Sequence, residues 1–151
     1  MKRFVRFFPL LAMVAIGIAV GLGIYTFYFA KGASYLSNNP AACANCHVMR
    51  DYYDAWRKGS HHASAVCNDC HAPADLVGKY ATKAINGFNH SVAFTFGNYN
   101  DTLSATPMNQ RIAENACRKC HQTIVSAIEV HSGRSSETKC VRCHAEVGHA
   151  R

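Results

Sequence analysis

Eight cysteines fall into four pairs of identical spacing, and a histidine follows each pair at once. The pairs are Cys43/Cys46, Cys67/Cys70, Cys117/Cys120 and Cys140/Cys143, and the histidines are His47, His71, His121 and His144. Cys-x-x-Cys-His is the attachment motif of c-type haem. The two thiols form thioethers with the vinyl groups of one porphyrin, and the next imidazole can reach the iron. Four motifs therefore predict four covalently bound haems.

Zinc sites and disulfide scaffolds also use paired cysteines. Neither needs a histidine directly after every pair, so both explain this sequence less well than haem does. In bacteria c-type haems are attached outside the cytoplasm, which places the haem-bearing part of the chain there. Because the haems use all eight cysteines, the cysteine count carries no prediction of disulfides.

Four six-coordinate haems need eight axial ligands, and the motif histidines supply at most four. The further candidates are Met49, His61, His62, Lys83, His90, His131 and His149. His62 lies five residues before Cys67 and His149 five residues after His144. These two are the leading distal ligands, each for a haem of the other half of the domain. His61, His90 and His131 remain open.

The motifs begin at residues 43, 67, 117 and 140, so two short intervals flank a long one. This spacing predicts two dihaem modules, at about 43–71 and 117–149, within a cytochrome domain spanning 31–151. The linker is predicted to be helical from Leu76 to about Phe96, which places Lys83 and His90 on one helix face. We expect a mainly α fold with long loops and almost no sheet, in which the porphyrins form much of the core.

Residues 7–30 carry no charged side chain. As a helix they would be about 36 Å long, enough to cross a hydrocarbon core of about 30 Å. A cleaved signal peptide is the alternative, but its apolar region is normally shorter. The aromatic residues at the end of the segment suit a membrane interface. The basic residues in positions 1–6 predict a cytoplasmic N-terminus and a periplasmic haem domain, anchored in the inner membrane.

The net charge of +7 overstates how basic the exposed domain is. Four of the sixteen Lys and Arg residues lie at or before position 31, which leaves twelve against nine Asp and Glu. Eight haem propionates would add further negative charge. A nucleic-acid partner is therefore not expected.

With these features, the chain resembles the NapC/NirT family of membrane-anchored tetrahaem quinol dehydrogenases. The resemblance covers nearly the whole chain and is carried by CANCHVM at the first motif, SHHASAVCNDCHAP at the second and KAINGFNH in the linker. It implies that menaquinol is oxidised at the membrane. It also implies that a larger multihaem cytochrome c nitrite reductase subunit accepts the electrons and reduces nitrite to ammonia. Homo-oligomers would arise through assembly of that complex.

The resemblance also assigns roles to residues. It implies that Met49, and not His47, is the proximal ligand of the first haem. The proximal ligands of the other three haems would be His71, His121 and His144, and the resemblance supports His62 and His149 as distal ligands. One haem in the family, by position the second, takes a distal lysine from the larger subunit, so that His71 would have no partner within this chain.

Lys83 matches a family lysine linked to quinol binding near the first haem, which makes it a candidate for the quinol site. His90 is a second candidate, although it stands where the family member has an aspartate. It would bind the iron directly or accept a proton. His131 has no clear counterpart in the family, which weakens its case as a distal ligand.

Two other functions compete with the one implied. The same quinol chemistry can feed a different periplasmic reductase, and an open iron at the first haem would suit a ligand sensor. Cys-His-x-Met at the first motif favours the nitrite reductase role, because within the family it marks the small subunit of that enzyme.

Overall fold

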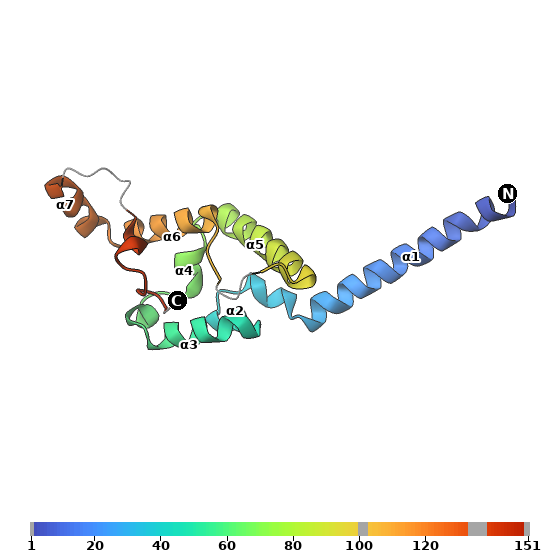
Figure 1. Ribbon diagram of the computed structural model, residues 1–151, viewed down its shortest axis with the longest axis horizontal. Coiled ribbons are helices and arrows are strands. Elements are labelled where there is room, and N and C mark those ends of the chain that lie inside the picture. The colour runs from blue at the N-terminus through green and yellow to red at the C-terminus, as the bar shows by residue number, and fades with distance from the viewer. Residues whose placement is uncertain (1, 100–102, 133–138, 150–151) are drawn as a thin grey trace. The chain divides into compact units, whose positions relative to one another are not determined.

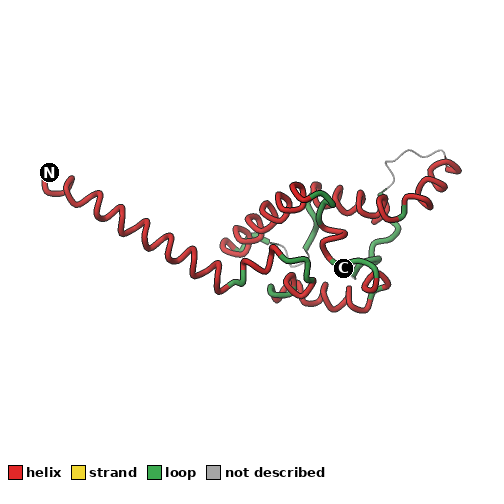
Figure 2. The backbone as a smooth tube through the Cα atoms, turned by 180° about the vertical axis from the view of Figure 1, so that it is seen from behind, coloured by secondary structure: helices red, strands yellow, loops and turns green. Residues whose placement is uncertain are grey.

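The computed structural model describes residues 2–99, 103–132 and 139–149, with the side chains of residues 2–6 and 131–132 left aside. Helices and turns make up the described chain, and no strand occurs in those ranges (Figure 2). Two compact units are present, residues 1–35 and residues 36–151. The mainly α architecture expected from the sequence is confirmed.

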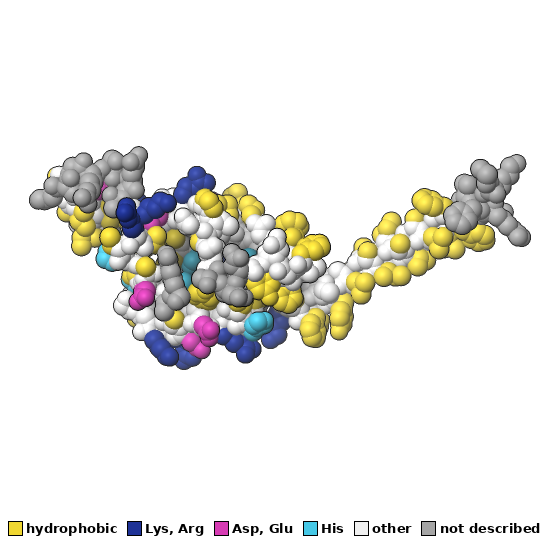
Figure 3. All heavy atoms as spheres, in the orientation of Figure 1, with side chains coloured by type: hydrophobic (Ala, Val, Ile, Leu, Met, Phe, Trp, Pro, Cys, Tyr) yellow, Lys and Arg dark blue, Asp and Glu magenta, His cyan; other side chains and the backbone are white. Residues whose placement is uncertain are grey.

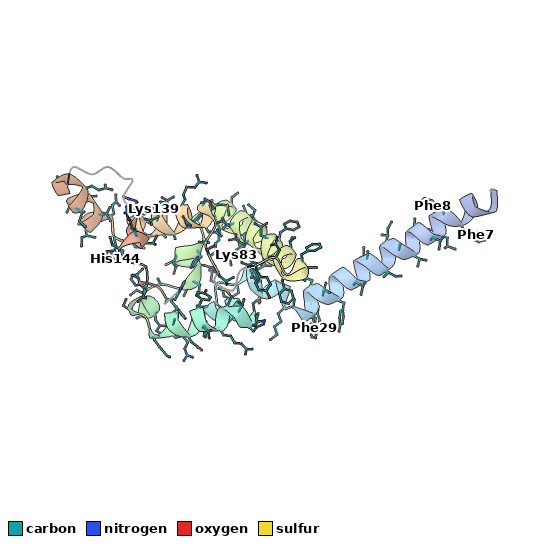
Figure 4. All side chains as sticks on the ribbon, viewed as in Figure 1. Phe7, Phe8, Phe29, Lys83, Lys139 and His144 are labelled. Carbon is teal, nitrogen blue, oxygen red and sulfur yellow. The ribbon has the colours of Figure 1, made fainter. Side chains whose placement is uncertain are left out.

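The first unit contains α1 (Lys2–Phe29), followed by the 3₁₀ turn η1 (Gly32–Leu36) that leads into the second unit. Within α1, the stretch Phe7–Phe29 is long and apolar enough to cross a membrane, with a mean hydropathy of 2.4. Hydrophobic side chains surround its axis (Figure 3), and Figure 4 labels Phe7, Phe8 and Phe29 at its two ends. The helix ends at Phe29, and Lys31, two residues further on, adopts φ 53°.

The second unit holds all four motifs on short elements (Figure 1). In chain order the helices and 3₁₀ turns after η1 are α2 (Pro40–Cys43), η2 (His47–Met49), α3 (Arg50–Lys58), η3 (Ser60–Ala63), α4 (Cys67–His71), α5 (Leu76–Phe96), α6 (Pro107–Cys120), α7 (Gln122–Ser132) and η4 (Cys140–Arg142). Among them α4 and α6 pack together most extensively. The second motif thus lies against the helix that carries the third.

The helix α5 has the bounds that the sequence predicts, and both ends have a local cause. Asp75 caps the start, because its carboxylate accepts a hydrogen bond of 2.6 Å from the Gly78 N–H. Gly97 ends the helix at φ 65°, a left-handed conformation in which a residue without a Cβ meets little strain.

The second unit has almost no core made of its own side chains. Among the described residues only Ala72 and Thr82 are buried. A packed domain of this size normally encloses many large apolar side chains. The packing of the described helices therefore encloses almost none of the unit's own side chains.

Candidate functional site

The first motif begins in a capped turn. Asn39 caps α2 by accepting a hydrogen bond of 3.0 Å from the Ala41 N–H. The turn η2 follows the motif, and its last residue, Met49, donates its N–H to the Cys46 carbonyl at 2.9 Å. The Met49 side chain is half-buried, whereas that of His47 is exposed.

The second motif forms the whole of α4, whereas the third lies at the end of α6. Asp69 caps the start of α4, accepting a hydrogen bond of 2.8 Å from the Val66 N–H. The third motif occupies the last turn of α6 and runs into the C-cap residue His121. α6 begins at Pro107, where the Thr106 hydroxyl accepts from the Asn109 N–H at 3.3 Å.

Glu114 holds the fourth motif against α6. Its carboxylate accepts hydrogen bonds from the N–H groups of Cys140 at 2.8 Å and Val141 at 3.1 Å. Partial burial raises the pKa of this carboxyl, but the hydrogen bonds from the Cys140 and Val141 segment outweigh burial and hold the pKa below its ordinary value. Figure 4 shows the neighbouring Lys139 and His144 in this part of the domain.

Replacing Glu114 by alanine is expected to lower the free energy of unfolding by about 1.5–3 kcal/mol, because two backbone donors lose a charged acceptor. Since the folded carboxyl has a lowered pKa, this contribution is complete above its ordinary value of 4.5 and is lost as the pH falls below that. Urea unfolding of the wild type and the variant at pH 7 and pH 4 would measure both effects. If wild type and variant differ by the same unfolding free energy at pH 7 and at pH 4, the role of the Glu114 carboxylate is contradicted.

The cysteines of successive motifs are neighbours in space. The thiols of Cys43 and Cys67 are hydrogen-bonded to each other, which lowers the pKa of Cys43 to about 7 and raises that of Cys67. Burial and Glu114 raise the pKa of both Cys117 and Cys140, and these two thiols also influence each other. In a haem-bearing protein these sulfurs are thioethers and do not titrate. What the contacts show is which motifs lie close to each other. They bring the first motif to the second and the third motif to the fourth.

The second motif lies near the third, because α4 packs on α6. Burial is the main cause that raises the pKa of Cys70, and the nearby Cys117 thiol adds to it. The four motifs therefore follow one another in space in the same order as in the chain.

The eight predicted attachment cysteines do not share one environment. Cys46, Cys120 and Cys143, each the second cysteine of its motif, are exposed, whereas the other five are half-buried. Cys143 is the C-cap residue of η4, and its N–H donates to the Cys140 carbonyl at 3.2 Å. The sequence does not distinguish the two cysteines of this motif. In the structure only Cys140 is held against α6, by the hydrogen bond from its N–H to Glu114. The role of Cys143 as the second haem attachment point of this motif stays a prediction.

Two pairs of histidine rings face each other across the second unit. The ring centres of His71 and His149 are 6.0 Å apart with planes 11° apart. Those of His61 and His121 are 6.1 Å apart with planes at 73°. Two metal–nitrogen bonds of about 2 Å, plus about 1 Å from each nitrogen to its ring centre, place the rings of a bis-histidine metal about 6 Å apart. The separation of the ring centres in both pairs equals that expected for two histidines on one metal.

The environment of each pair fits an iron placed inside a porphyrin. Desolvation, and secondarily the nearby His149, lowers the pKa of His71, although its side chain is exposed. The Ser60 hydroxyl lies 3.3 Å from Nδ1 of His61, which leaves Nε2 of that ring for a metal.

Sequence reasoning placed His62 ahead of its neighbour, and the structure locates the two differently. His61 faces His121, while the His62 ring packs edge-on against Trp56, with the two ring centres 4.7 Å apart. Trp56 is fixed by its own indole N–H, which donates to the Ala65 carbonyl at 3.0 Å. His144 is exposed, and the side chain of His131 lies outside the described residues.

Lys83 lies beside the first motif. Its ammonium donates a hydrogen bond of 2.7 Å to the Ser37 carbonyl and lies near enough to Cys43 for the two groups to affect each other's pKa. Desolvation is the main cause that lowers the pKa of Lys83, and Lys79 adds to it. Figure 4 shows Lys83 on α5.

His90 lies two turns further along the same face of α5, about 10 Å along the axis from Lys83. Desolvation lowers the pKa of His90, so its ring is neutral at pH 7 and has a nitrogen free to take a proton.

Comparison with known proteins agrees with these features. The model of the NapC/NirT cytochrome c family, N-terminal region, matches residues 6–151. The chain belongs to the NapC/NirT cytochrome c family. Membership implies covalently bound haem c, which the paired cysteines and the facing histidines accommodate. Groups of three or more His, Cys, Asp or Glu side chains arranged for a bare metal ion are absent from the described residues.

Individual members of the NapC/NirT family align over most of the chain. Cytochrome c-type protein NrfH of Wolinella succinogenes is 36% identical over 97% of this chain and 88% of that protein. Cytochrome c nitrite reductase subunit NrfH of Nitratidesulfovibrio vulgaris is 34% identical over 81% of this chain and 74% of its own. A crystal structure of the cytochrome c nitrite reductase NrfHA complex bound to the HQNO inhibitor matches with a TM-score of 0.60 and 27% identity, covering 87% of each chain.

Proposed function

We propose that this chain is the membrane-anchored quinol dehydrogenase of a cytochrome c nitrite reductase complex. Two NrfH relatives match most of the chain, and one of them is named as a cytochrome c nitrite reductase subunit. The observation that carries the proposal is the succession of four attachment motifs: Lys83 and Asn68 bond to the segment before the first motif, α4 packs on α6, and Glu114 holds the fourth motif to α6. One end of such a succession receives electrons from quinol and the other delivers them to the larger nitrite reductase subunit.

The cofactors are four haems c, one on each motif, the last of them on Cys140 and Cys143. When bound, they supply one-electron carriers arranged in sequence. The protein's part is to hold adjacent motifs in contact and to choose the iron ligands. Because the first motif lies against the second, the second near the third, and the third against the fourth, neighbouring porphyrins attach to neighbouring sulfurs.

We assign the axial ligands from geometry together with the family resemblance. The proximal ligands are Met49, His71, His121 and His144. His149 is the distal ligand opposite His71, and His61 is the one opposite His121. A lysine of the larger subunit, implied for the second haem, would have to displace His149 when the complex forms. His62 and His131 remain the candidates for the haem of His144.

The quinol site lies between α5 and the first motif. Oxidation of menaquinol to menaquinone releases two electrons and two protons. The Lys83 ammonium is placed to donate a hydrogen bond to a quinol oxygen in exchange for its bond to the Ser37 carbonyl. His90, neutral at pH 7, accepts a proton on the same helix face. The anchor α1 keeps this site at the inner membrane, with the N-terminus in the cytoplasm and the haem domain in the periplasm.

Replacing Lys83 by leucine is expected to slow reduction of the haems by menaquinol at least tenfold, because a charge-assisted hydrogen bond to the quinol is lost. Reduction by dithionite, which needs no quinol site, should keep its wild-type rate. The full chain in lipid nanodiscs, monitored by haem absorbance in stopped flow, provides both rates. Lys79→Leu, one turn earlier on α5, is the matched control.

The partner is tested in the same preparation. Adding the nitrite reductase catalytic subunit together with nitrite should convert menaquinol oxidation from a single burst into steady turnover. If Lys83→Leu and the wild type reduce equally fast, Lys83 does not belong to the quinol site. If quinol reduces the haems but turnover needs a different reductase, the quinol chemistry stands and the partner assignment is wrong.

A further inference from the structure

The helix α5 turns its polar face inward. Lys83 bonds to the Ser37 carbonyl, Asn86 and Asn109 exchange two hydrogen bonds of 3.1 Å, and Thr82 is buried. Both charged side chains of the helix, Lys79 and Lys83, lie on this side. The first motif is also on this side, since Lys83 interacts with Cys43.

The opposite side, which we call the outer face of α5, is apolar and exposed. It is formed by Val77, Tyr80, Ala84, Phe88 and Val92, which follow one another at helical spacing. Val77 is 83% exposed and Phe88 69%. Figure 3 shows hydrophobic side chains gathered over this helix. The segment that holds Cys43 lies on the inner side of the helix, opposite this face.

Besides the phenol of Tyr80, two hydroxyl groups interrupt this face, and both are satisfied within the helix. The Ser91 hydroxyl donates to the Gly87 carbonyl at 2.8 Å, and the Thr95 hydroxyl donates to the Ser91 carbonyl at 2.7 Å. The outer face therefore offers no charge to its surroundings, and tyrosine is a residue type that suits a membrane interface. A surface of this kind suits an environment without water.

The chain itself brings α5 close to a bilayer. Lys83 is bonded to Ser37, and the apolar span ends at Phe29. Seven residues lie between these positions, and five of them form the 3₁₀ turn η1. Even fully extended, the eight steps from Phe29 to Ser37 reach about 28 Å. Because this tether is short, the membrane is always near α5 and has a high effective concentration there. A separate protein would have to reach α5 by diffusion.

We propose that the outer face of α5 lies in the interfacial layer of the bilayer that holds α1, with the helix axis along the membrane plane. An apolar helix face bound in this way is buried by about 5–10 Å at the boundary of headgroups and acyl chains. The inner face, with Lys83 and His90, then lies above the lipid at the level where a quinol headgroup emerges. The proposal rests on the proposed function in one respect, namely that α1 anchors the chain in a membrane.

Protection of single thiols tests the proposal. The haems occupy all eight native cysteines, so Phe88→Cys and Val77→Cys each introduce the sole free thiol. Asp54→Cys on α3, whose native side chain is 61% exposed, is the control. Haem-loaded full-length chains, incorporated at one per nanodisc of zwitterionic and anionic phospholipids, are treated with a charged, membrane-impermeant maleimide.

We expect both α5 thiols to react at least tenfold more slowly than the Asp54→Cys thiol, and all three to react alike after denaturation. One chain per disc excludes protection by a second copy. Equal labelling of the three thiols in discs would overturn the proposal. So would protection that arises only after the catalytic subunit is added, because the face would then bind protein. Menaquinol-driven haem reduction, measured in the same discs, keeps this outcome separate from failure of the proposed function.

Discussion

Replacing His61 by alanine is expected to remove the sixth ligand from one of the four haems. The His61 ring faces that of His121 at 6.1 Å, so the variant leaves an iron with a single histidine. About a quarter of the low-spin haem signal should become high-spin, and the open position should bind carbon monoxide. Electron paramagnetic resonance and the carbon monoxide difference spectrum of the purified chain measure both changes.

The adjacent histidine supplies the control. His62 packs against Trp56, so His62→Ala should leave the His121 haem low-spin. Mass spectrometry must show four attached haems in each variant, so that a change in ligation is distinguished from failed maturation. His61→Met should keep the iron six-coordinate while raising its reduction potential. If the high-spin signal accompanies His62→Ala and is absent from His61→Ala, the ligand assignment is reversed.

Replacing Met49 by histidine is expected to lower the potential of the first haem on the order of 100 mV, within the range of about 0.8 V that axial ligands set. A thioether is a poorer donor to ferric iron than an imidazole, so methionine favours the reduced state. Because about 59 mV is a tenfold change for a one-electron couple, the variant should shift the equilibrium for accepting an electron from quinol by roughly 50-fold.

Substitution of His47, two positions before Met49, distinguishes the two possible proximal ligands. His47 is exposed and Met49 half-buried, so His47→Ala should leave the potential and spectrum of the first haem unchanged. Redox titration of the haem absorbance, with the four components resolved, provides the comparison. A potential that responds to His47→Ala and ignores substitution of Met49 would make His47 the ligand.

Local sequence signals predicted the elements well where one residue fixes a boundary. Asp75 and Gly97 bound α5, and the uncharged stretch of residues 7–30 corresponds to the apolar span of α1. Both depend on backbone capping or on composition, which act over a few neighbouring positions. The bounds of these helices were therefore readable before any tertiary contact was known.

Contacts between distant segments were not readable in this way. His61 and His62 are adjacent and chemically identical, and only the turn η3 decides which ring faces His121. Glu114 was missed altogether, because a glutamate three residues before a motif carries no signal that it will cap the turn at Cys140. Residue types indicated which ligands are available, while their pairing depends on how α4 packs on α6.

The near absence of buried side chains has a consequence for how the protein is made. With only Ala72 and Thr82 buried in the described chain, the polypeptide gains little hydrophobic free energy by folding alone. Most of that gain has to come with the porphyrins, so haem attachment and folding are one event, as metal binding and folding are in small metalloproteins. A newly exported chain is then a substrate for periplasmic proteases until its haems are attached. Supply of haem, and not synthesis of the polypeptide, would set how much of the protein accumulates.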